Sequence, residues 1–333
     1  MPPNQSAAAG AKLSAPAAAL IRGVGDAIAP RGKGQGRVCV MNYHRVLRHA
    51  DPLLESEPDV DTFRWQMRLL KECFNVIPLH DAVMAVRDQR IAPRTVCITF
   101  DDGYRAVHDL ALPVLKEFGL PATVFVTSGY VGESHMWNDR IIEAVESIPS
   151  GELNLQAFGL GVYSLRTLDD RKIAVARLTA STKYIPPHAR DELIDHLEKM
   201  VGNNLAHGLM LNRQMVVNLA REGIEIGAHT ISHPILTSLD DAEARREIVD
   251  GKLQLEEMTG KPVRLFAYPN GKVGMDFDER HARMVREAGF DAAFTTEVGS
   301  VNSTQDRYQL PRSRPWDTTP FRFGLRLLRW LAR

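Results

Sequence analysis

Two adjacent carboxylates stand out in the sequence CITFDDGYRA, where Asp101 and Asp102 directly follow an apolar, β-branched run that ends at Phe100. Adjacent like charges repel, so a fold that holds both carboxylates at the end of a buried strand needs a cation or a shared proton nearby. Taken alone, a DDG sequence is typical of a turn with solvated carboxylates. A second motif is needed to choose between these interpretations.

The motif GAHTISHP supplies it, with His229 and His233 four residues apart in a chain that has 11 histidines. The preceding strand pattern and the following Pro234 favour a loop or a single turn over a helix. Two histidines and one carboxylate of the Asp pair would make an open, three-ligand metal site of the catalytic type. The other Asp would then accept a proton from a water molecule that the metal acidifies.

The elements that must position these motifs are short β-rich runs that alternate with amphipathic helical patterns from residue 37 onward. Such alternation predicts a parallel sheet covered by helices, most simply a closed or nearly closed α/β barrel. The strand ends of a barrel meet on one face, where active sites lie. Four runs end in polar groups on that predicted face, namely VCVMNY at His44, TVCITF at the Asp pair, IEIGA at His229, and RLFAY at Pro269 and Asn270.

We expect residues 1–36 to form a mobile or weakly helical leader and residues 37–315 to form the barrel. Residues 133–212 contain several helical patterns and few strand signals, which predicts a mostly helical insertion placed where it could cover a site. The leader is too short to span a bilayer and lacks the charged start of a secretion signal, so we expect a cytoplasmic protein.

The segment 316–333 is predicted to form a basic amphipathic helix. Its arginines, Arg322, Arg326, Arg329 and Arg333, recur at helical spacing, and the apolar residues fall largely on other faces. Such a helix suits peripheral contact with an anionic inner-membrane surface. The alternative is a terminal helix that packs its apolar face on the barrel.

Composition excludes some functions. Lys and Arg total 41 and Asp and Glu total 41, so the net charge is 0 and nucleic acid is not an expected partner. The odd number of cysteines, Cys39, Cys73 and Cys97, argues against a closed disulfide framework. Each cysteine lies in an apolar stretch, which predicts a small core residue.

The motifs TFDDGY and HTISHP resemble the first and second motifs of the polysaccharide deacetylases, carbohydrate esterase family 4, and FAYPNG resembles the third. The similarity extends from about residue 37 to 315, and the chain resembles members associated with bacterial exopolysaccharide biosynthesis. This resemblance implies a distorted (β/α) barrel that removes acetyl groups, usually from N-acetylated sugars of a polysaccharide or lipid-linked glycan, by metal-dependent hydrolysis.

The resemblance also implies residue roles. Asp101 corresponds to the general base, whereas Asp102, His229 and His233 correspond to the ligands of a divalent metal, expected to be zinc. The backbone N–H of Tyr104 corresponds to the oxyanion donor, which agrees with the need for a preorganised donor at a tetrahedral intermediate.

Two positions depart from the family pattern. Ala267 stands where the third motif usually has an arginine that orients the base, and Arg312 in QLPRSRP is a candidate replacement. No late strand ends in a histidine that would serve as general acid. His44, at the end of an early strand, is our candidate, because different strand ends can supply one point in space. Some exopolysaccharide deacetylases similarly have a Tyr-His near the start. The alternative is a rim histidine that only binds a loop.

Substrate contacts are predicted more weakly. Trp137 suits stacking on a sugar ring, or else anchors the core of the insertion. Alternatives to N-deacetylation are an O-acetyl esterase or a small-molecule amidohydrolase on the same fold, a non-catalytic carbohydrate-binding protein, or a metal oxygenase with the same ligands. The candidate substrate-binding residues are Tyr268, Pro269, Asn270, Trp137 and Arg312.

Overall fold

The computed structural model describes residues 12–29, 36–133, 135–185, 187–202, 208–314 and 317–332. The described residues form two compact units. The first unit takes its residues from the segments Met1–Ala50, Ser56–Val131 and Leu211–Arg333, and the second from Asp51–Glu55 and Gly132–Met210.

A parallel sheet is the centre of the first unit, with strand order β1-β3-β4-β7-β8-β9 and β2 paired to β3. Nearly all of its residues are buried, as expected for strands covered on both faces. The strands predicted from the runs VCVMNY, TVCITF, IEIGA and RLFAY are all present, and β2 is an addition that the sequence pattern did not predict. The strands are β1 Val38–Tyr43, β2 Asn75–Val76, β3 Thr95–Phe100, β4 Thr123–Val126, β7 Glu225–Ala228, β8 Leu265–Ala267 and β9 Ala292–Phe294.

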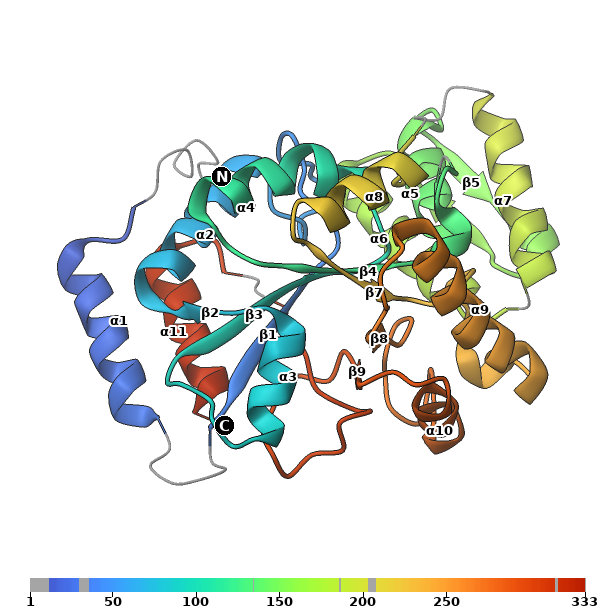
Figure 1. Ribbon diagram of the computed structural model, residues 1–333. Coiled ribbons are helices and arrows are strands. Elements are labelled where there is room, and N and C mark those ends of the chain that lie inside the picture. Colours follow the sequence, from blue (N-terminus) through green and yellow to red (C-terminus); the bar gives the residue numbers. More distant parts are fainter. Residues whose placement is uncertain are drawn as a thin grey trace. The chain divides into compact units, whose positions relative to one another are not determined.

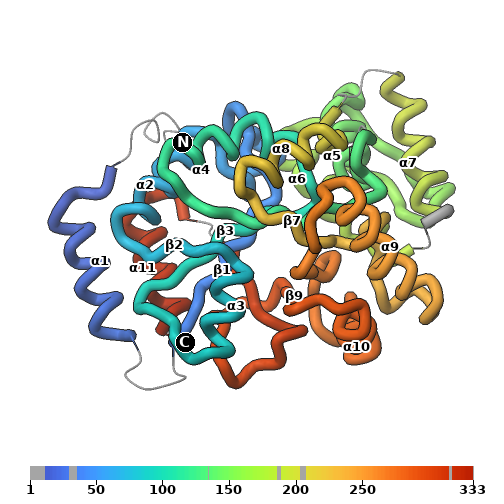
Figure 2. Tube along the Cα trace, in the orientation of Figure 1, coloured from blue at the N-terminus to red at the C-terminus, as the bar shows by residue number. Residues whose placement is uncertain are grey.

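The two edges of this sheet are joined by an extended segment rather than by a regular strand. Leu310 bridges Phe294 of β9, and Ser313 bridges Met41 of β1, both in the parallel sense. The sheet therefore curls into a distorted (β/α) barrel, which confirms the predicted fold class. Figure 2 shows this late segment returning to the side of β1.

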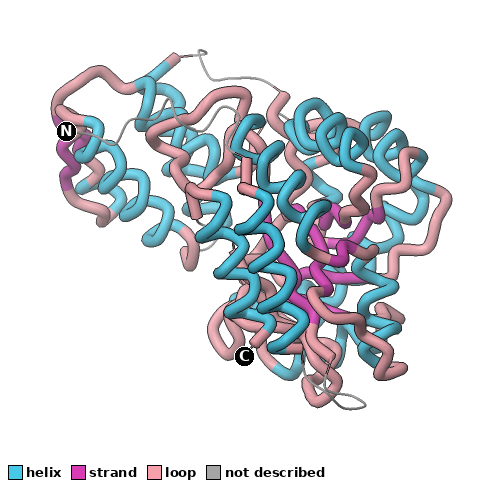
Figure 3. Tube along the Cα trace, turned by 90° about the vertical axis from the view of Figure 1, so that its left-hand side faces the viewer, coloured by secondary structure: helices cyan, strands magenta, loops and turns pink. Residues whose placement is uncertain are grey.

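Helices cover the sheet of the first unit, as Figures 1 and 3 show. Their ends follow local chemistry: α9 begins with a capping box formed by Asp240 and Glu243, and α4 ends at Gly119, whose φ is 61°. The helices are α1 Ala15–Ile28, α2 Val60–Cys73, α3 Leu79–Arg87, α4 Leu112–Phe118, α8 Arg213–Arg221, α9 Asp241–Thr259, α10 Glu279–Glu287 and α11 Pro320–Leu331.

Helices α1 and α11, from opposite ends of the chain, lie side by side (Figure 1). A Cβ atom on Gly324 would lie 2.4 Å from Cδ1 of Ile21, so the two helices are in close contact there. Part of the segment expected to be a mobile leader is therefore packed helix, because Ile21 and Ala18 bury apolar surface against the unit. The apolar face of α11 is buried too, as the barrel-packing alternative requires. None of the described helices is long and apolar enough to cross a membrane.

Phe323 on α11 offers a direct test of this packing. Its side chain is fully buried, and its ring meets Trp65 of α2 edge to face at 5.5 Å. Phe323→Ala is expected to lower the free energy of unfolding by about 3–5 kcal/mol, since it removes a buried ring and leaves a cavity. Leu325→Ala, at an exposed site on the same helix, should change it by less than about 0.5 kcal/mol. Equal effects in urea denaturation would contradict the packing.

The second unit is mostly helical, and it lies within the predicted insertion apart from Asp51–Glu55 and Gly132. It has its own apolar core, which includes Ile141, Leu178 and Leu197. A short antiparallel pair of strands accompanies three helices. These elements are α5 Trp137–Ser147, β5 Glu152–Asn154, β6 Val162–Ser164, α6 Leu168–Thr182 and α7 Pro187–Val201.

Candidate active site

The carboxyl ends of neighbouring strands in the first unit bring the predicted residues to one place. Tyr43 pairs with Phe100 in the register of β1 and β3, so His44 and Asp101 leave the sheet at the same level. The backbone N–H of Asp101 donates to the Tyr43 carbonyl at 2.9 Å. His229 follows β7, and its N–H donates to Val126 of β4 at 3.1 Å.

Asp101 is held by Arg312 in a two-pronged ion pair. Nη1 and Nη2 of Arg312 donate to the two carboxylate oxygens at 2.6 and 2.7 Å. The same guanidinium donates to the Thr295 carbonyl and to the Thr99 hydroxyl, and both ends of the pair are buried. This geometry fixes the plane of the Asp101 carboxylate, as the arginine missing at Ala267 was expected to do.

Asp102, His229 and His233 form a compact cluster of donor atoms. Oδ1 of Asp102 lies 3.4 Å from Nε2 of His229 and 3.4 Å from Nε2 of His233. Among the described residues, this buried oxygen has no hydrogen-bond partner. The ligating atoms of the three residues lie within 4.8 Å of one another, close enough to surround one ion.

The orientation of His229 also suits a metal ligand. Its Nδ1 lies 2.7 Å from the carbonyl oxygen of Ala267, which can only accept a hydrogen bond. The Nδ1 atom therefore carries the proton, and Nε2 turns its lone pair toward Asp102. A histidine held this way by a backbone carbonyl is usual for metal-ligating imidazoles. An orphaned carboxylate oxygen and an oriented imidazole together fit a divalent cation.

The loop that carries the two histidines is clamped by Glu247 of α9. The Glu247 carboxylate accepts hydrogen bonds from the backbone N–H groups of Ile231 and Ser232, at 2.8 and 2.9 Å, and from the Ser232 hydroxyl at 2.7 Å. Residues 229–233 are not helical, as predicted, and His233 has a left-handed φ of 57°. Such strain persists only where surrounding contacts hold it.

The turn after the Asp pair is equally constrained. Gly103 has a φ of 90°, and a Cβ atom there would lie 3.2 Å from Val126, so a side chain is disfavoured on both counts. Tyr104 is buried, and the Arg45 guanidinium lies over its ring at 4.5 Å. The backbone N–H of Tyr104 is therefore held in place by the constrained turn that follows Asp102.

Electrostatics distinguish the members of the site. Burial raises the pKa of Asp101, but the Arg312 guanidinium and nearby imidazoles together lower it by more than burial raises it. The pKa of Asp101 therefore lies below its usual range. The pKa of Asp102 is low in the same way, since neighbouring histidines outweigh its burial. Burial lowers the pKa of His233 to about 4, which leaves its ring neutral at pH 7. Both carboxylates are therefore ionised at neutral pH.

The environment of His44 was not predicted from the sequence. Nη2 of Arg314 lies 3.0 Å from Nδ1 of His44, and the same Nη2 donates to Oε1 of Glu57 at 2.5 Å. Burial lowers the pKa of His44, as does the Arg314 charge, while Asp102, Glu57 and Asp101 act in the opposite direction. The sequence did contain one signal, because Arg314 follows Arg312 by two residues, the period that places side chains on one face of an extended segment.

The weaker substrate-binding predictions need correction. Tyr268 is fully buried, stacked on Phe277 at 3.6 Å, with its hydroxyl donating to the Tyr308 carbonyl, so its side chain is not placed to contact a glycan. Arg312 is likewise committed to Asp101 and buried. Pro269 is buried as well, whereas Asn270 is partly exposed.

Trp137 belongs to the second unit, where its side chain is 6% exposed and lies in the apolar core. The Arg190 guanidinium lies 4.7 Å from its ring centre. These contacts match the core-anchor interpretation of Trp137 rather than stacking on a sugar.

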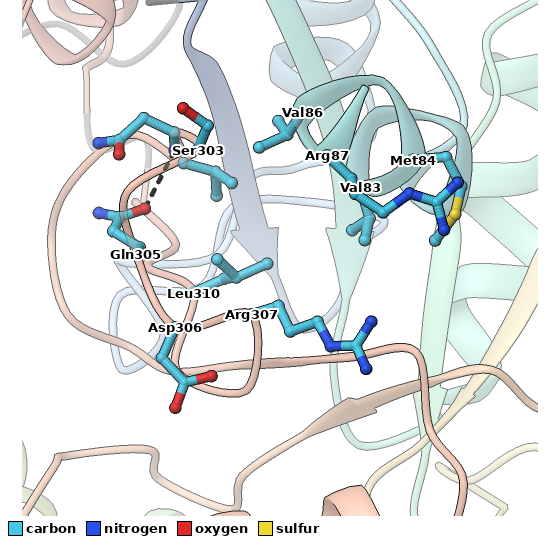
Figure 4. A pocket seen from close by; sticks show the side chains of 11 residues that line it. Val83, Met84, Val86, Arg87, Ser303, Gln305, Asp306, Arg307 and Leu310 are labelled. Carbon is cyan, nitrogen blue, oxygen red and sulfur yellow. Dashed lines mark hydrogen bonds between the residues drawn. The ribbon is translucent and has the colours of Figure 1, made fainter. Parts of the chain in front are cut away.

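A pocket of about 320 Å³ lies elsewhere in the first unit. Val301 in its wall exchanges backbone hydrogen bonds with Val38 at the start of β1, whereas the candidate site lies where the strands end. Figure 4 shows side chains of α3 facing those of the segment 301–310. No member of the Asp–His cluster lines the pocket, whose lining residues are Val83, Met84, Val86, Arg87, Val301, Asn302, Ser303, Gln305, Asp306, Arg307 and Leu310.

Comparison with known proteins identifies the family. The model of the polysaccharide deacetylase family matches residues 88–293, which contain the Asp pair and both histidines. The chain therefore belongs to the polysaccharide deacetylase family, as the motifs predicted.

Individual relatives are distant. YxkH of Bacillus subtilis is 22% identical over 237 residues, covering 71% of this chain and 57% of that protein. The poly-beta-1,6-N-acetyl-D-glucosamine N-deacetylase of Staphylococcus epidermidis is 26% identical over 142 residues, covering 38% of this chain and 49% of that protein. The chain thus spans about half the length of these curated relatives.

Solved structures share the fold. The deacetylase PplD of Streptococcus pyogenes, in complex with acetate, has a TM-score of 0.59 at 16% identity, covering 88% of this chain and 98% of that one. IcaB from Ammonifex degensii has a TM-score of 0.58 at 18% identity, covering 90% of this chain and 98% of that one. These likenesses place the barrel of the first unit among deacetylase folds.

Proposed function

We propose that this protein is a metal-dependent hydrolase that removes acetyl groups from N-acetylated sugars of a polysaccharide or lipid-linked glycan. One observation carries the proposal: an ionised carboxylate, Asp101, is fixed by Arg312 directly beside a three-residue ligand set. A base and a metal site of this kind are the two parts that hydrolysis of an unactivated acetyl group needs.

Asp102, His229 and His233 would hold the metal, which we propose to be zinc because two imidazoles and one carboxylate suit an open zinc site. When bound, the metal supplies Lewis acidity that lowers the pKa of a water molecule in the site. Burial lowers the pKa of His229, but the Asp102 carboxylate raises it by more, so the pKa lies above its usual value. A metal ion must therefore compete with protons for the His229 ring. Metal uptake should therefore release protons.

Asp101 would then take a proton from this water molecule while the water oxygen attacks the acetyl carbon. The Tyr104 backbone N–H is proposed to donate to the oxygen that becomes negative in the tetrahedral intermediate. When the carbon–nitrogen bond breaks, the leaving nitrogen needs a proton, and His44 is proposed to supply it. The products are acetate and a free amino sugar.

His44→Gln is expected to keep the fold and the metal while lowering turnover of an N-acetyl substrate by about 10²–10⁴-fold. An activated aryl acetate should lose less, because its leaving group departs without a proton. Acetate release measured on both substrates checks this result. Near wild-type turnover of the amide would show that the general acid lies elsewhere.

The proposed function is tested by acetate release from the zinc-loaded protein over a panel of acetylated glycans. Oligomers of β-1,6-linked N-acetylglucosamine belong first in the panel, because a relative is named for that substrate; lipid-linked N-acetyl sugars and O-acetylated glycans complete it. Release from N-acetyl substrates supports the proposal. Release from O-acetyl substrates alone would favour an esterase, and binding without release would favour a non-catalytic carbohydrate-binding protein.

A further inference from the structure

The side of His44 that faces Arg314 has a definite protonation state. A guanidinium has five N–H donors and no acceptor, so the contact of 3.0 Å between Arg314 Nη2 and His44 Nδ1 requires Nδ1 to accept. In the neutral ring the proton must then be on Nε2. The Arg314 contact therefore selects one of the two tautomers of His44.

Arg314 is in turn held by Glu57. The Glu57 side chain is 8% exposed, and its Oε1 accepts from Arg314 Nη2 at 2.5 Å, while its Oε2 accepts from the backbone N–H of Arg45 at 3.4 Å. Arg45 directly follows His44, so the Glu57 carboxylate ties the guanidinium to the strand end that carries the histidine. A buried pair with this geometry restricts the guanidinium much more than an exposed ion pair would.

His44 also lies at the strand end beside Asp101. Tyr43 pairs with Phe100 in the register of β1 and β3, and the Asp101 N–H donates to the Tyr43 carbonyl at 2.9 Å. With Nδ1 taken by Arg314, Nε2 is the nitrogen left for a reacting group.

We infer that Arg314, held by Glu57, is a positioning residue that keeps the proton of His44 on Nε2, ready for the leaving nitrogen. This inference rests on the proposed function for its catalytic meaning. It differs from the common arrangement in which a carboxylate accepts from the second ring nitrogen of a catalytic histidine. Here a cation donates to that nitrogen, which favours the neutral ring over the imidazolium. When the neutral ring gives its Nε2 proton to the leaving nitrogen, an imidazolate remains, and the adjacent Arg314 guanidinium would stabilise its negative charge. The proton that Asp101 took from the water would then return to His44 and restore the neutral ring.

The tautomer is measured directly by long-range ¹H–¹⁵N NMR of histidine-labelled, zinc-loaded protein, with the His44 signals assigned by their loss in His44→Gln. In the wild type we expect a protonated Nε2 and an unprotonated Nδ1. Arg314→Met should give a mixture of tautomers, and Arg314→Lys should restore part of the Nε2–H form, because the ammonium still donates but lacks the planar fork. A protonated Nδ1 in the wild type would overturn the inference, whether or not the protein releases acetate.

Kinetics separate positioning from general destabilisation. Arg314→Met is expected to lower kcat on an N-acetyl substrate by about 10- to 100-fold, with a smaller loss on an activated aryl acetate and bound zinc unchanged. Because this variant leaves the Glu57 carboxylate unpaired, the double variant Glu57→Gln/Arg314→Met should show the same selective loss with better folding. Equal losses on both substrates would contradict a positioning role.

A matched control is Arg280→Met. Arg280 also pairs with a carboxylate, that of Asp241 at 2.5 Å, but on α10 and more than a third exposed. We expect the His44 signals and both activities of this variant to match the wild type, although the signals of His281, whose Nε2 lies 3.2 Å from Arg280 Nη2, should change.

Discussion

His229→Ala is expected to abolish most zinc binding. The cluster offers three ligating side chains, so removing one leaves two, too few for a stable zinc site. Metal content after dialysis, measured by mass spectrometry against protein concentration, checks the result. Turnover should fall with the metal content, and excess zinc should restore little of it.

The buried position of His229 requires a second variant. His229 is 1% exposed, so its replacement leaves a cavity, whereas the His233 side chain is 12% exposed and His233→Ala should disturb the fold less. The matched control is His49→Ala, an exposed histidine for which zinc content should not change. Stoichiometric zinc in both cluster variants would disprove the ligand assignment.

Replacement of the two aspartates by asparagine is expected to affect different properties, turnover for Asp101 and metal binding for Asp102. Asp101→Asn should retain the metal and lose about 10²–10⁴-fold in turnover, since the amide keeps the shape of the base but cannot take the proton. Asp102→Asn should weaken metal binding itself, because the amide oxygen replaces a charged ligand. Zinc titration and acetate release, measured on both variants, separate the roles.

The buried partner of Asp101, Arg312, makes a stability control necessary for this comparison. In Asp101→Asn the guanidinium stays buried without its carboxylate, although Thr295 and Thr99 still accept from it. Some loss of stability is therefore expected, and thermal unfolding should be measured beside activity. If Asp101→Asn and Asp102→Asn lost metal equally, the assignment of base and ligand would be wrong.

Local sequence pattern was enough to predict the strands that carry the site and the side chains at their ends. The runs ending at Tyr43 and Phe100 are the strands β1 and β3 with the expected limits, because β-branched and apolar runs between polar turns have few other stable arrangements. Since the strands are parallel, their carboxyl ends must lie on one face. The convergence of Asp101, Asp102 and His229 follows from that rule.

Motif spacing likewise predicted the non-helical loop that carries both histidines. The pattern did not reveal what holds this loop. Glu247 lies on a helix face where many carboxylates are solvated, and nothing local marks it as the clamp of Ile231 and Ser232. Nor does Tyr268 look different from a surface tyrosine until its stacking on Phe277 is seen.

Only the tertiary structure decided which distant side chains contact the residues of the site. Arg312 reaches Asp101 across 211 residues of sequence, and Arg314 reaches His44 across 270. Both contacts depend on the segment 310–313 joining the edges of the barrel, and periodicity within one segment carries no information about which distant edge it will meet. The residue types of the site are therefore local properties of the sequence, whereas the pairing of Asp101 and His44 with two arginines is a property of barrel closure.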